Sequence, residues 1–289
     1  MDKKPIPPQR IAIATHPQLS AAETLAQKIS EFLALEPVKV TCAPLVDPDL
    51  QRQIQEGKFD MLIALGGDGT MLRAGGMTAA SRVPVLGINA GRFGFLTAVH
   101  ANEWQPTIQR IMKGDYWLED RMMLHAEHFR GEEKLGAWEV VNECTIGRGK
   151  MVRPVRLITE VDHHFLTTYV ADAVIVSTPT GSTAYALAAG GPILPPELRN
   201  ILIVPVAPHL SVDRAIVLHE GSWVRVTVRT DHEASLTVDG QPSVEMQDGD
   251  QVRVSAGQHV VQFVRLQSAD YFYRNLTSRM NQNPTAGER

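Results

Sequence analysis

The chain has 289 residues, 44% of them hydrophobic and 21% charged, which is enough to bury the cores of two ordinary globular domains or of one large domain. Its formal net charge of −4, with no basic run, argues against a nucleic acid as partner. The two cysteines are too few for a disulfide framework or a thiolate zinc site and suit a reducing compartment, so we interpret Cys42 and Cys144 as buried apolar residues.

The sequence carries no pattern typical of a signal peptide or a membrane span. Residues Met1 to Gln9 include lysine and proline but no apolar stretch, and no later segment approaches the length needed to cross a bilayer. We therefore expect a cytoplasmic protein without a membrane partner.

The first part of the chain alternates between strand-like and helix-like patterns. Residues 10–16 predict a buried strand, and Ser20 to Glu23 has the spacing of a capping box that begins a helix. Leu25, Ile29, Phe32 and Leu33 then fall on one face of that helix. The pattern continues with a strand at 38–43, a helix at 48–55, a strand at 60–65, a helical segment, and a strand at 84–89. Such alternation is typical of a parallel sheet.

After about Tyr116 extended runs separated by turn signals replace the alternation, which predicts a mostly β region. Asp239-Gly240 and Asp248-Gly249 are predicted hairpin turns. The predicted extended runs are 137–146, 155–161, 166–177, 201–206, 223–229 and 252–264. Helical spacing is found again at 184–189 and at 269–280, and the polar residues 281–289 are predicted to be disordered.

The segment Gly66-Gly67-Asp68-Gly69-Thr70 lies between a predicted buried strand and a helix, where α/β sheets place their ligands. Glycines allow the backbone to approach phosphate oxygens, and the helix offers its N-terminal amides to an anion. A carboxylate there would repel phosphate, so Asp68 suggests chemistry, either metal binding or proton transfer. The alternative is a turn in which Asp tolerates an unusual backbone angle. No Lys-Ser or Lys-Thr pair follows, so the segment is not a P-loop.

A second candidate segment is the run of hydroxyl side chains from Ser177 to Tyr185, also between a strand and a short helix. Ser and Thr can cap that helix or bind a neutral polar ligand, with Tyr185 supplying a flat face. Asp172 precedes the strand, where its carboxylate could accept hydrogen bonds from an amide or a ribose. A capped turn and an exposed Asp at a strand start are equally compatible with this pattern.

A third segment places Asn142 and Glu143 inside an otherwise apolar strand. Asn can read an adenine edge and Glu can accept from ribose hydroxyls, whereas the simpler alternative is an edge strand that faces water. The ten histidines show no metal-ligand spacing, His163-His164 is interpreted as a turn, and no metal ligand is predicted.

Together, these segments and their order resemble the NAD kinase family over most of the chain. The Gly66 to Thr70 motif alone is shared with diacylglycerol and sphingosine kinases. The Asn142-Glu143 pair, the run from Ser177 continuing to Gly190-Gly191-Pro192, and the loop from Asn89 to Leu96 resemble the other signatures of the family. The resemblance implies a Rossmann-like α/β domain at 1–115, joined by a C-terminal helix at 269–289, and a β-sandwich-like, NAD-binding domain at 116–268.

The resemblance also implies roles for individual residues. Asp68 would be the general base toward the 2′-hydroxyl, Gly69 and Arg73 would contact the dinucleotide, and Asn142 with Glu143 would contact its adenosine and sugars. Asp172 would hold the nicotinamide amide or its ribose, although Ala171 and Ala173 replace the flanking glycines usual in the family. The remaining implied binding residues are Gly66, Gly67, Arg153, Thr180, Thr183, Ala184, Tyr185, Ala186, Leu187, Ala188 and Gln241.

The implied reaction is transfer of the γ-phosphoryl group of ATP to NAD, with Mg²⁺ bridging the triphosphate. The family resemblance also implies a homodimer or homotetramer. Two alternatives remain, a lipid kinase that shares the glycine motif and a dinucleotide sensor that has lost catalysis. The sequence shows no basic amphipathic helix that could bind a membrane surface, which argues against a lipid kinase. The retained Asp68 argues against a sensor that has lost catalysis. The donor range, the acceptance of NADH and feedback by NADP or NADPH have no signature in the sequence.

Overall fold

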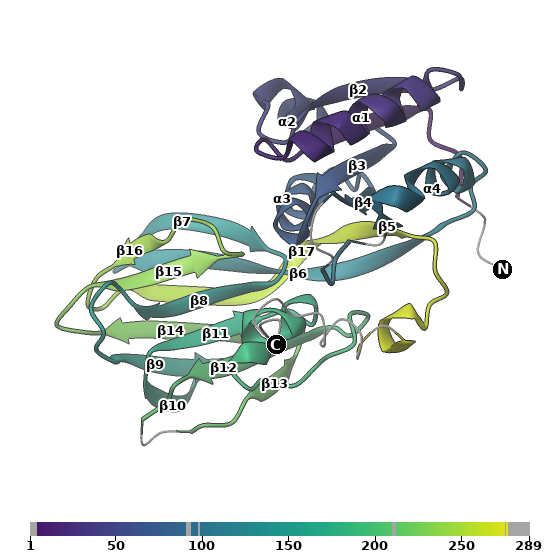
Figure 1. Ribbon diagram of the computed structural model, residues 1–289. Coiled ribbons are helices and arrows are strands. Elements are labelled where there is room, and N and C mark those ends of the chain that lie inside the picture. Colours follow the sequence, from purple (N-terminus) through teal and green to yellow (C-terminus); the bar gives the residue numbers. More distant parts are fainter. Residues whose placement is uncertain (1–4, 91–93, 98, 210–211, 275, 277–289) are drawn as a thin grey trace, which may run out of the picture. The chain divides into compact units, whose positions relative to one another are not determined.

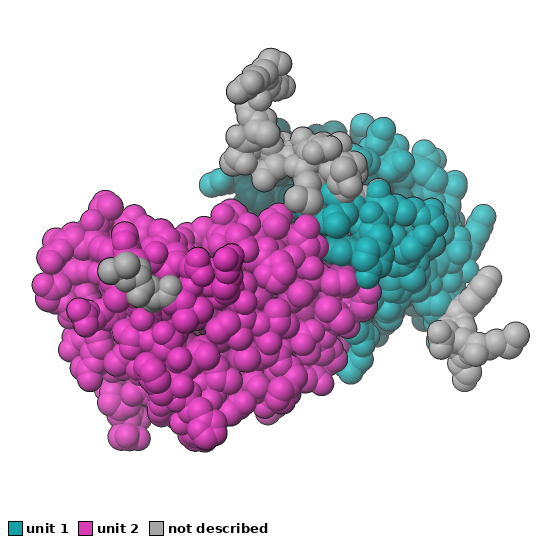
Figure 2. Space-filling view, turned by 90° about the horizontal axis from the view of Figure 1, so that it is seen from below, with its two compact units in different colours: residues 1–120, 261–289 teal, residues 121–260 magenta. Residues whose placement is uncertain are grey.

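A computed structural model describes residues 5–90, 94–97, 99–209, 212–274 and 276. The chain divides into two compact units, coloured separately in Figure 2. Unit 1 comprises Met1–Asp120 and Val261–Arg289, and unit 2 comprises Arg121–Val260. Among the described residues, no helix is long and apolar enough to span a membrane.

Unit 1 is built on a parallel sheet with the strand order β2-β1-β3-β4-β17, and β5 adds to β4 (Figure 1). Alternation along the sequence thus correctly predicted a parallel sheet. The sheet is also Rossmann-like, as the family resemblance implied. The strands are β1 (Arg10–Thr15), β2 (Lys39–Pro44), β3 (Met61–Gly66), β4 (Val85–Asn89), β5 (Val99–His100) and the end of β17 (Gln251–Arg265). The helices are α1 (Ser20–Leu33), α2 (Pro48–Gln55), α3 (Asp68–Thr78), the short η1 (Ala101–Glu103) and α4 (Trp104–Ile111).

The core of unit 1 forms where α1 and α4 pack on the sheet. Ile29 and Leu33 of α1 and Ile108 of α4 are fully buried in one apolar cluster with Ile13 and Ile63 of the central strands. β3 lies between β1 and β4, and all six of its residues are buried. The residues that follow β3 therefore start from a fixed position.

Unit 2 is a sandwich of two antiparallel sheets, as the all-β expectation required. Val224 and Val254 from one sheet pack with Ile146, Val176 and Ile203 from the other. The first sheet contains β6 (Trp117–Arg130), β7 (Glu133–Val140), β9 (Val155–Val161), β10 (His164–Ala171), β14 (Trp223–Arg229) and β17. The second contains β8 (Glu143–Arg148), β11 (Ala173–Ser177), β12 (Asn200–Val206), β13 (Ile216–His219), β15 (Ala234–Val238) and β16 (Val244–Met246).

Two predicted extended runs are each divided between the two sheets. The run 137–146 becomes β7 and β8, which are separated by Val141 and Asn142, and the run 166–177 becomes β10 and β11, which are separated by Asp172. The polar residues Asn142 and Asp172 therefore mark points where the chain passes from one layer of the sandwich to the other.

Three local predictions are wrong. The capping box at Ser20 does not form, because α1 begins with Leu19 as N-cap and without a side-chain cap hydrogen bond. Asp239-Gly240 does connect paired strands, but Asp248-Gly249 is not a hairpin turn, since β16 pairs with β15 and β17 belongs to the other sheet. Cys144 is buried as expected, whereas Cys42 is exposed because β2 is an edge strand.

Two predicted segments lie partly outside the described residues. Of the C-terminal helix, residues 271–274 and 276 are helical, and 277–289 are not described. The loop from Asn89 to Leu96 lacks a description at 91–93. Of the predicted turn at His163-His164, His163 does lie between β9 and β10, with a φ of 69°, whereas His164 is the first residue of β10.

Candidate active site

The glycine motif joins β3 to α3, with Gly67 as the N-cap of the helix. A Cβ built at Gly66 would overlap the side chain of Thr70, so this glycine is needed for the tight turn. Cβ atoms at Gly67 and Gly69 would meet nothing within 4 Å. Two positions at the start of this 11-residue helix thus border open space, and the N-terminus of a helix is where anions bind.

Asp68 is the first residue of α3, and its carboxylate accepts three backbone hydrogen bonds from one loop. The amide of Phe95 donates to Oδ2 at 2.7 Å, and the amides of Leu96 and Thr97 donate to Oδ1 at 3.0 and 3.4 Å. Asp68 is not among the residues with positive φ. A turn that exploits the backbone tolerance of Asp therefore does not describe this residue.

Gly94 lies directly against this carboxylate. A Cβ at position 94 would overlap Cγ and both carboxylate oxygens of Asp68. The loop can hold Asp68 only because residue 94 has no side chain. Arg73, exposed on the same helix, makes no ion pair with another described residue.

In unit 2 the second and third candidate segments interlock. The carbonyl of Asn142 accepts from the amide of Thr178 at 2.8 Å and from Oγ of Ser177 at 3.1 Å. Oγ1 of Thr178 donates to the carbonyl of Val141 at 2.7 Å, and a Cβ at Gly181 would overlap the Asn142 carbonyl oxygen. The hydroxyl groups of Ser177 and Thr178 thus bind backbone carbonyls.

Asp239 fixes the same strand start from a third segment. Its Oδ1 accepts from the amides of Asn142 and Glu143 at 2.7 and 3.2 Å, and its Oδ2 accepts from Val141 at 2.8 Å. Sequence analysis interpreted Asp239 only as a turn residue. The sequence signal that could have indicated this role was an acidic side chain beside Gly240 and close to the predicted site residue Gln241.

The Asn142 and Glu143 side chains are buried, with exposed fractions of 9% each. Oδ1 of Asn142 and Oε2 of Glu143 have no hydrogen-bond partner among the described residues. Burial and the nearby charge of Asp239 raise the pKa of Glu143 to about 8. Two buried oxygens without donors are costly unless a ligand supplies amine or hydroxyl hydrogens.

The run after β11 forms η2 (Thr180–Thr183) and α5 (Tyr185–Ala188). Buried Arg121 donates to Oγ1 of Thr180 at 3.1 Å, a contact that sequence analysis missed because the two residues are 59 positions apart. Ala186 is fully buried in an apolar cluster, while Tyr185 is 44% exposed. Thr183 and Ala184 are partly buried, Leu187 is partly buried and Ala188 is exposed.

The remaining predicted residues occupy three different places in unit 2. Asp172 forms an ion pair with Nε of Arg148 at 3.2 Å. Arg153 is exposed and 3.8 Å from a carboxylate oxygen of Asp231. Gln241 is exposed, and its backbone amide donates to the carbonyl of Val238 at 2.9 Å, which closes the turn.

Comparison with known proteins identifies the family of this chain. Models of the ATP-NAD kinase N-terminal and C-terminal domains match residues 11–116 and 141–266. The NAD kinase of Chloroflexus aurantiacus is 37% identical over 276 residues, covering 95% of this chain and 99% of that protein. The chain belongs to the NAD kinase family.

Solved structures of NAD kinase relatives share its fold. A yeast NADH kinase complexed with NADH has a TM-score of 0.84 at 24% identity, covering 96% of this chain and 89% of the other. An NAD kinase from Archaeoglobus fulgidus in complex with ATP has a TM-score of 0.75 at 24% identity, covering 94% and 99%. The Rossmann-like and β-sandwich-like architecture is that of the NAD kinase fold.

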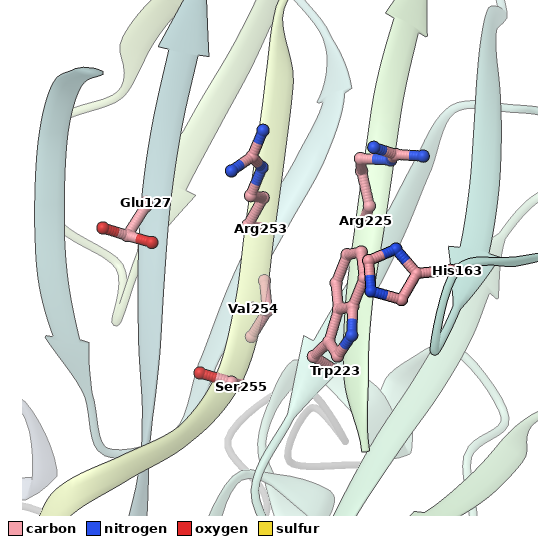
Figure 3. Close-up of a pocket in the computed structure, with 7 residues that line it drawn as sticks. All are labelled: Glu127, His163, Trp223, Arg225, Arg253, Val254 and Ser255. Atoms are coloured by element: carbon pink, nitrogen blue, oxygen red, sulfur yellow. The ribbon is translucent and has the colours of Figure 1, made fainter. Parts of the chain in front are cut away.

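None of the NAD kinase signature residues lines the pocket shown in Figure 3. This pocket, of about 440 Å³, lies in unit 2 on strands β6, β14 and β17 and is lined by Glu127, His163, Trp223, Arg225, Arg253, Val254 and Ser255. Arg225 is engaged by Glu160, with Nε and Nη2 at 2.5 and 2.7 Å from its two oxygens. The candidate active site is therefore not this pocket.

The raised pKa of Glu143 predicts a pH-dependent stability for this NAD kinase family member. Between its ordinary 4.5 and about 8, the folded protein binds a proton that the unfolded chain releases, so stability falls as pH rises through this window. Glu143→Gln removes the charge. Between pH 5 and 8 its melting temperature is expected to rise above that of the wild type, by about 2–4 °C for each kcal/mol of stability that the wild type loses.

Melting curves of the protein without ligand, at pH 5, 6, 7 and 8, test this prediction. Glu245→Gln, at an exposed position on β16, is the control and should follow the wild type. Parallel curves for wild type and Glu143→Gln would show that the Glu143 carboxyl is not desolvated as the structure indicates.

Proposed function

We propose that the protein transfers the γ-phosphoryl group of ATP to the 2′-hydroxyl of the adenosine ribose of NAD, giving NADP. Membership of the NAD kinase family supports the reaction class. The observation that carries the proposal is the carboxylate of Asp68, fixed by three backbone amides at the start of α3 in a motif otherwise suited to phosphate.

Asp68 acts as general base in this proposal. Oδ2 accepts one hydrogen bond from the described residues, from Phe95, so a second lone pair on that oxygen can accept a proton. The ribose oxygen attacks the γ-phosphorus, its proton passes to Asp68, and the bond from phosphorus to the departing ADP oxygen breaks. Positioning and electrostatic stabilisation supply most of the rate in such reactions.

Asn142 and Glu143 contribute NAD recognition. Their two buried oxygens without donors fit the amine and hydroxyl hydrogens of an adenosine. The raised pKa of Glu143 favours its protonated form, which can also donate one hydrogen bond. Asp172 would hold the nicotinamide amide or its ribose, and Gly69, Arg73 and the segment from Thr180 to Tyr185 would complete the contacts.

Mg²⁺ enters this proposal as part of the substrate, bound to the triphosphate of ATP. Within the described ranges, no group of three or more His, Cys, Asp or Glu side chains could hold a metal ion. The N-terminus of α3 and the glycine amides of its motif would hold the phosphates. We keep a homodimer or homotetramer in the cytoplasm as further parts of the proposal.

An assay with two acceptors separates the proposal from its rivals. The protein is incubated with ATP and Mg²⁺, with either NAD or diacylglycerol in vesicles, and NADP and phosphatidic acid are quantified. We expect NADP alone. Phosphatidic acid would favour a lipid kinase, and NAD binding without NADP would favour a sensor that has lost catalysis.

A further inference from the structure

A buried polar network in unit 1 leads from the C-terminal segment to the loop that holds Asp68. Arg265, 1% exposed at the end of β17, donates from Nε to Oε2 of Glu119 at 2.8 Å. The hydroxyl of Tyr271 lies 3.1 Å from both oxygens of Glu119. All three side chains are buried, with Glu119 at 7% and Tyr271 at 4%.

Arg265 also donates from Nη1 to the carbonyl oxygen of Leu96 at 3.1 Å. The amide of the same residue donates to Oδ1 of Asp68 at 3.0 Å. Leu96 therefore binds the Arg265 guanidinium with its carbonyl and the Asp68 carboxylate with its amide. One main-chain residue links the two charged side chains.

We propose that Arg265, held by Glu119 and Tyr271, is a positioning residue that fixes the loop of residues 94–97 and thereby orients the carboxylate of Asp68. The inference rests on the proposed function for its catalytic consequence, but the contacts it depends on are independent of that function. It assigns a role in the active site to residues close to the C-terminus of the chain.

The geometry explains why an ion pair is kept here at all. Burying a guanidinium and a carboxylate costs free energy, and apolar residues of similar volume are often as stable. An apolar side chain could fill the space but could not donate to Leu96. The planar guanidinium presents two nitrogens in fixed directions, one to Glu119 and one to the loop, which a lysine cannot reproduce.

Unit 1 contains a matched control. Arg110 makes the same pair of contacts, donating from Nε to Asp115 at 2.7 Å and from Nη2 to the carbonyl of Leu266 at 2.9 Å. That pair is exposed, and the carbonyl it binds belongs to no residue that contacts Asp68. Arg110→Lys therefore removes a hydrogen bond of the same type at an exposed position, without touching the loop.

The first measurement is hydrogen exchange of the amides of Phe95, Leu96 and Thr97 in the full chain. Arg265→Lys keeps a charge for Glu119 but loses the directed bond to Leu96, and we expect these amides to exchange about tenfold faster, equivalent to about 1.4 kcal/mol. Amides of β3 should keep the wild-type rate, as should all of these amides in Arg110→Lys.

The second measurement is steady-state kinetics with NAD and ATP. Arg265→Lys should lower kcat by about 10- to 100-fold, with both KM values within about twofold of wild type. In an Asp68→Asn background the same change should cost less than about threefold, because the carboxylate that the loop orients is gone. A purely structural role would instead lower kcat by the same factor in both backgrounds.

If Arg265→Lys fails to fold, the double variant Glu119→Gln with Arg265→Met removes both charges and is measured in the same way. Unchanged exchange at residues 95–97 would overturn the positioning role whatever the activity. A wild-type protein that forms no NADP would overturn the proposed function, and the exchange data would still decide whether Arg265 fixes the loop.

Discussion

Replacing Asp68 by Asn is expected to lower kcat for NAD phosphorylation by about 10²–10⁴-fold, the loss typical of a missing general base. The amide cannot accept the ribose proton. It also places an NH₂ group against one of the three loop amides, so we expect a moderate loss of stability of about 1–3 kcal/mol. NAD affinity, measured by calorimetry, should change little.

Asp239→Asn is the matched control, since Asp239 also accepts three consecutive backbone amides. Asp239→Asn should lose stability to a similar extent. Because Asp239 holds the start of the strand at Asn142, this variant should mainly change the KM for NAD. The smallest loss of turnover that a general base predicts is about 100-fold. If Asp68→Asn keeps more than about a tenth of the wild-type turnover, its loss is smaller than that, and Asp68 is not the base.

Gly94→Ala is expected to lower kcat by about 100-fold without removing any chemical group. The added methyl would overlap the carboxyl group of Asp68, so either the carboxylate or the loop must move. A displacement of about 1 Å at a reacting group can cost about 10²-fold in rate. Kinetics and the exchange of the amides at 95–97 measure the two consequences separately.

Gly76→Ala is its control, because Gly76 lies in α3 and a Cβ there meets nothing within 4 Å. Alanine in a helix interior should raise stability by about 0.5–1 kcal/mol and leave turnover intact. Wild-type turnover in Gly94→Ala would show that the loop adapts and that the close contact with Asp68 does not set its position.

Strands β1, β3 and β4 of unit 1 could be predicted because they are apolar on both faces and each is bounded by turn residues. The long strand β6 was missed, since Glu119, Arg121 and His128 interrupt its apolar pattern although all three are buried. Their partners Arg265, Thr180 and Asp250 lie 146, 59 and 122 residues away. No local pattern can show that a charged side chain will find a distant partner.

The sequence by itself determined the family, the alternation that builds a parallel sheet, and the placement of Asp68 between a buried strand and a helix, because these depend on local residue types and their spacing. Only the tertiary structure decided which polar side chains bind backbone and which keep free oxygens. The Thr178 hydroxyl donates to the carbonyl of Val141, and the Asp239 carboxylate accepts from three amides. Asn142 and Glu143, in contrast, retain acceptor oxygens for a ligand. Hydrogen bonds between segments far apart in the chain depend on packing, which fixes distance and direction only once the fold is complete.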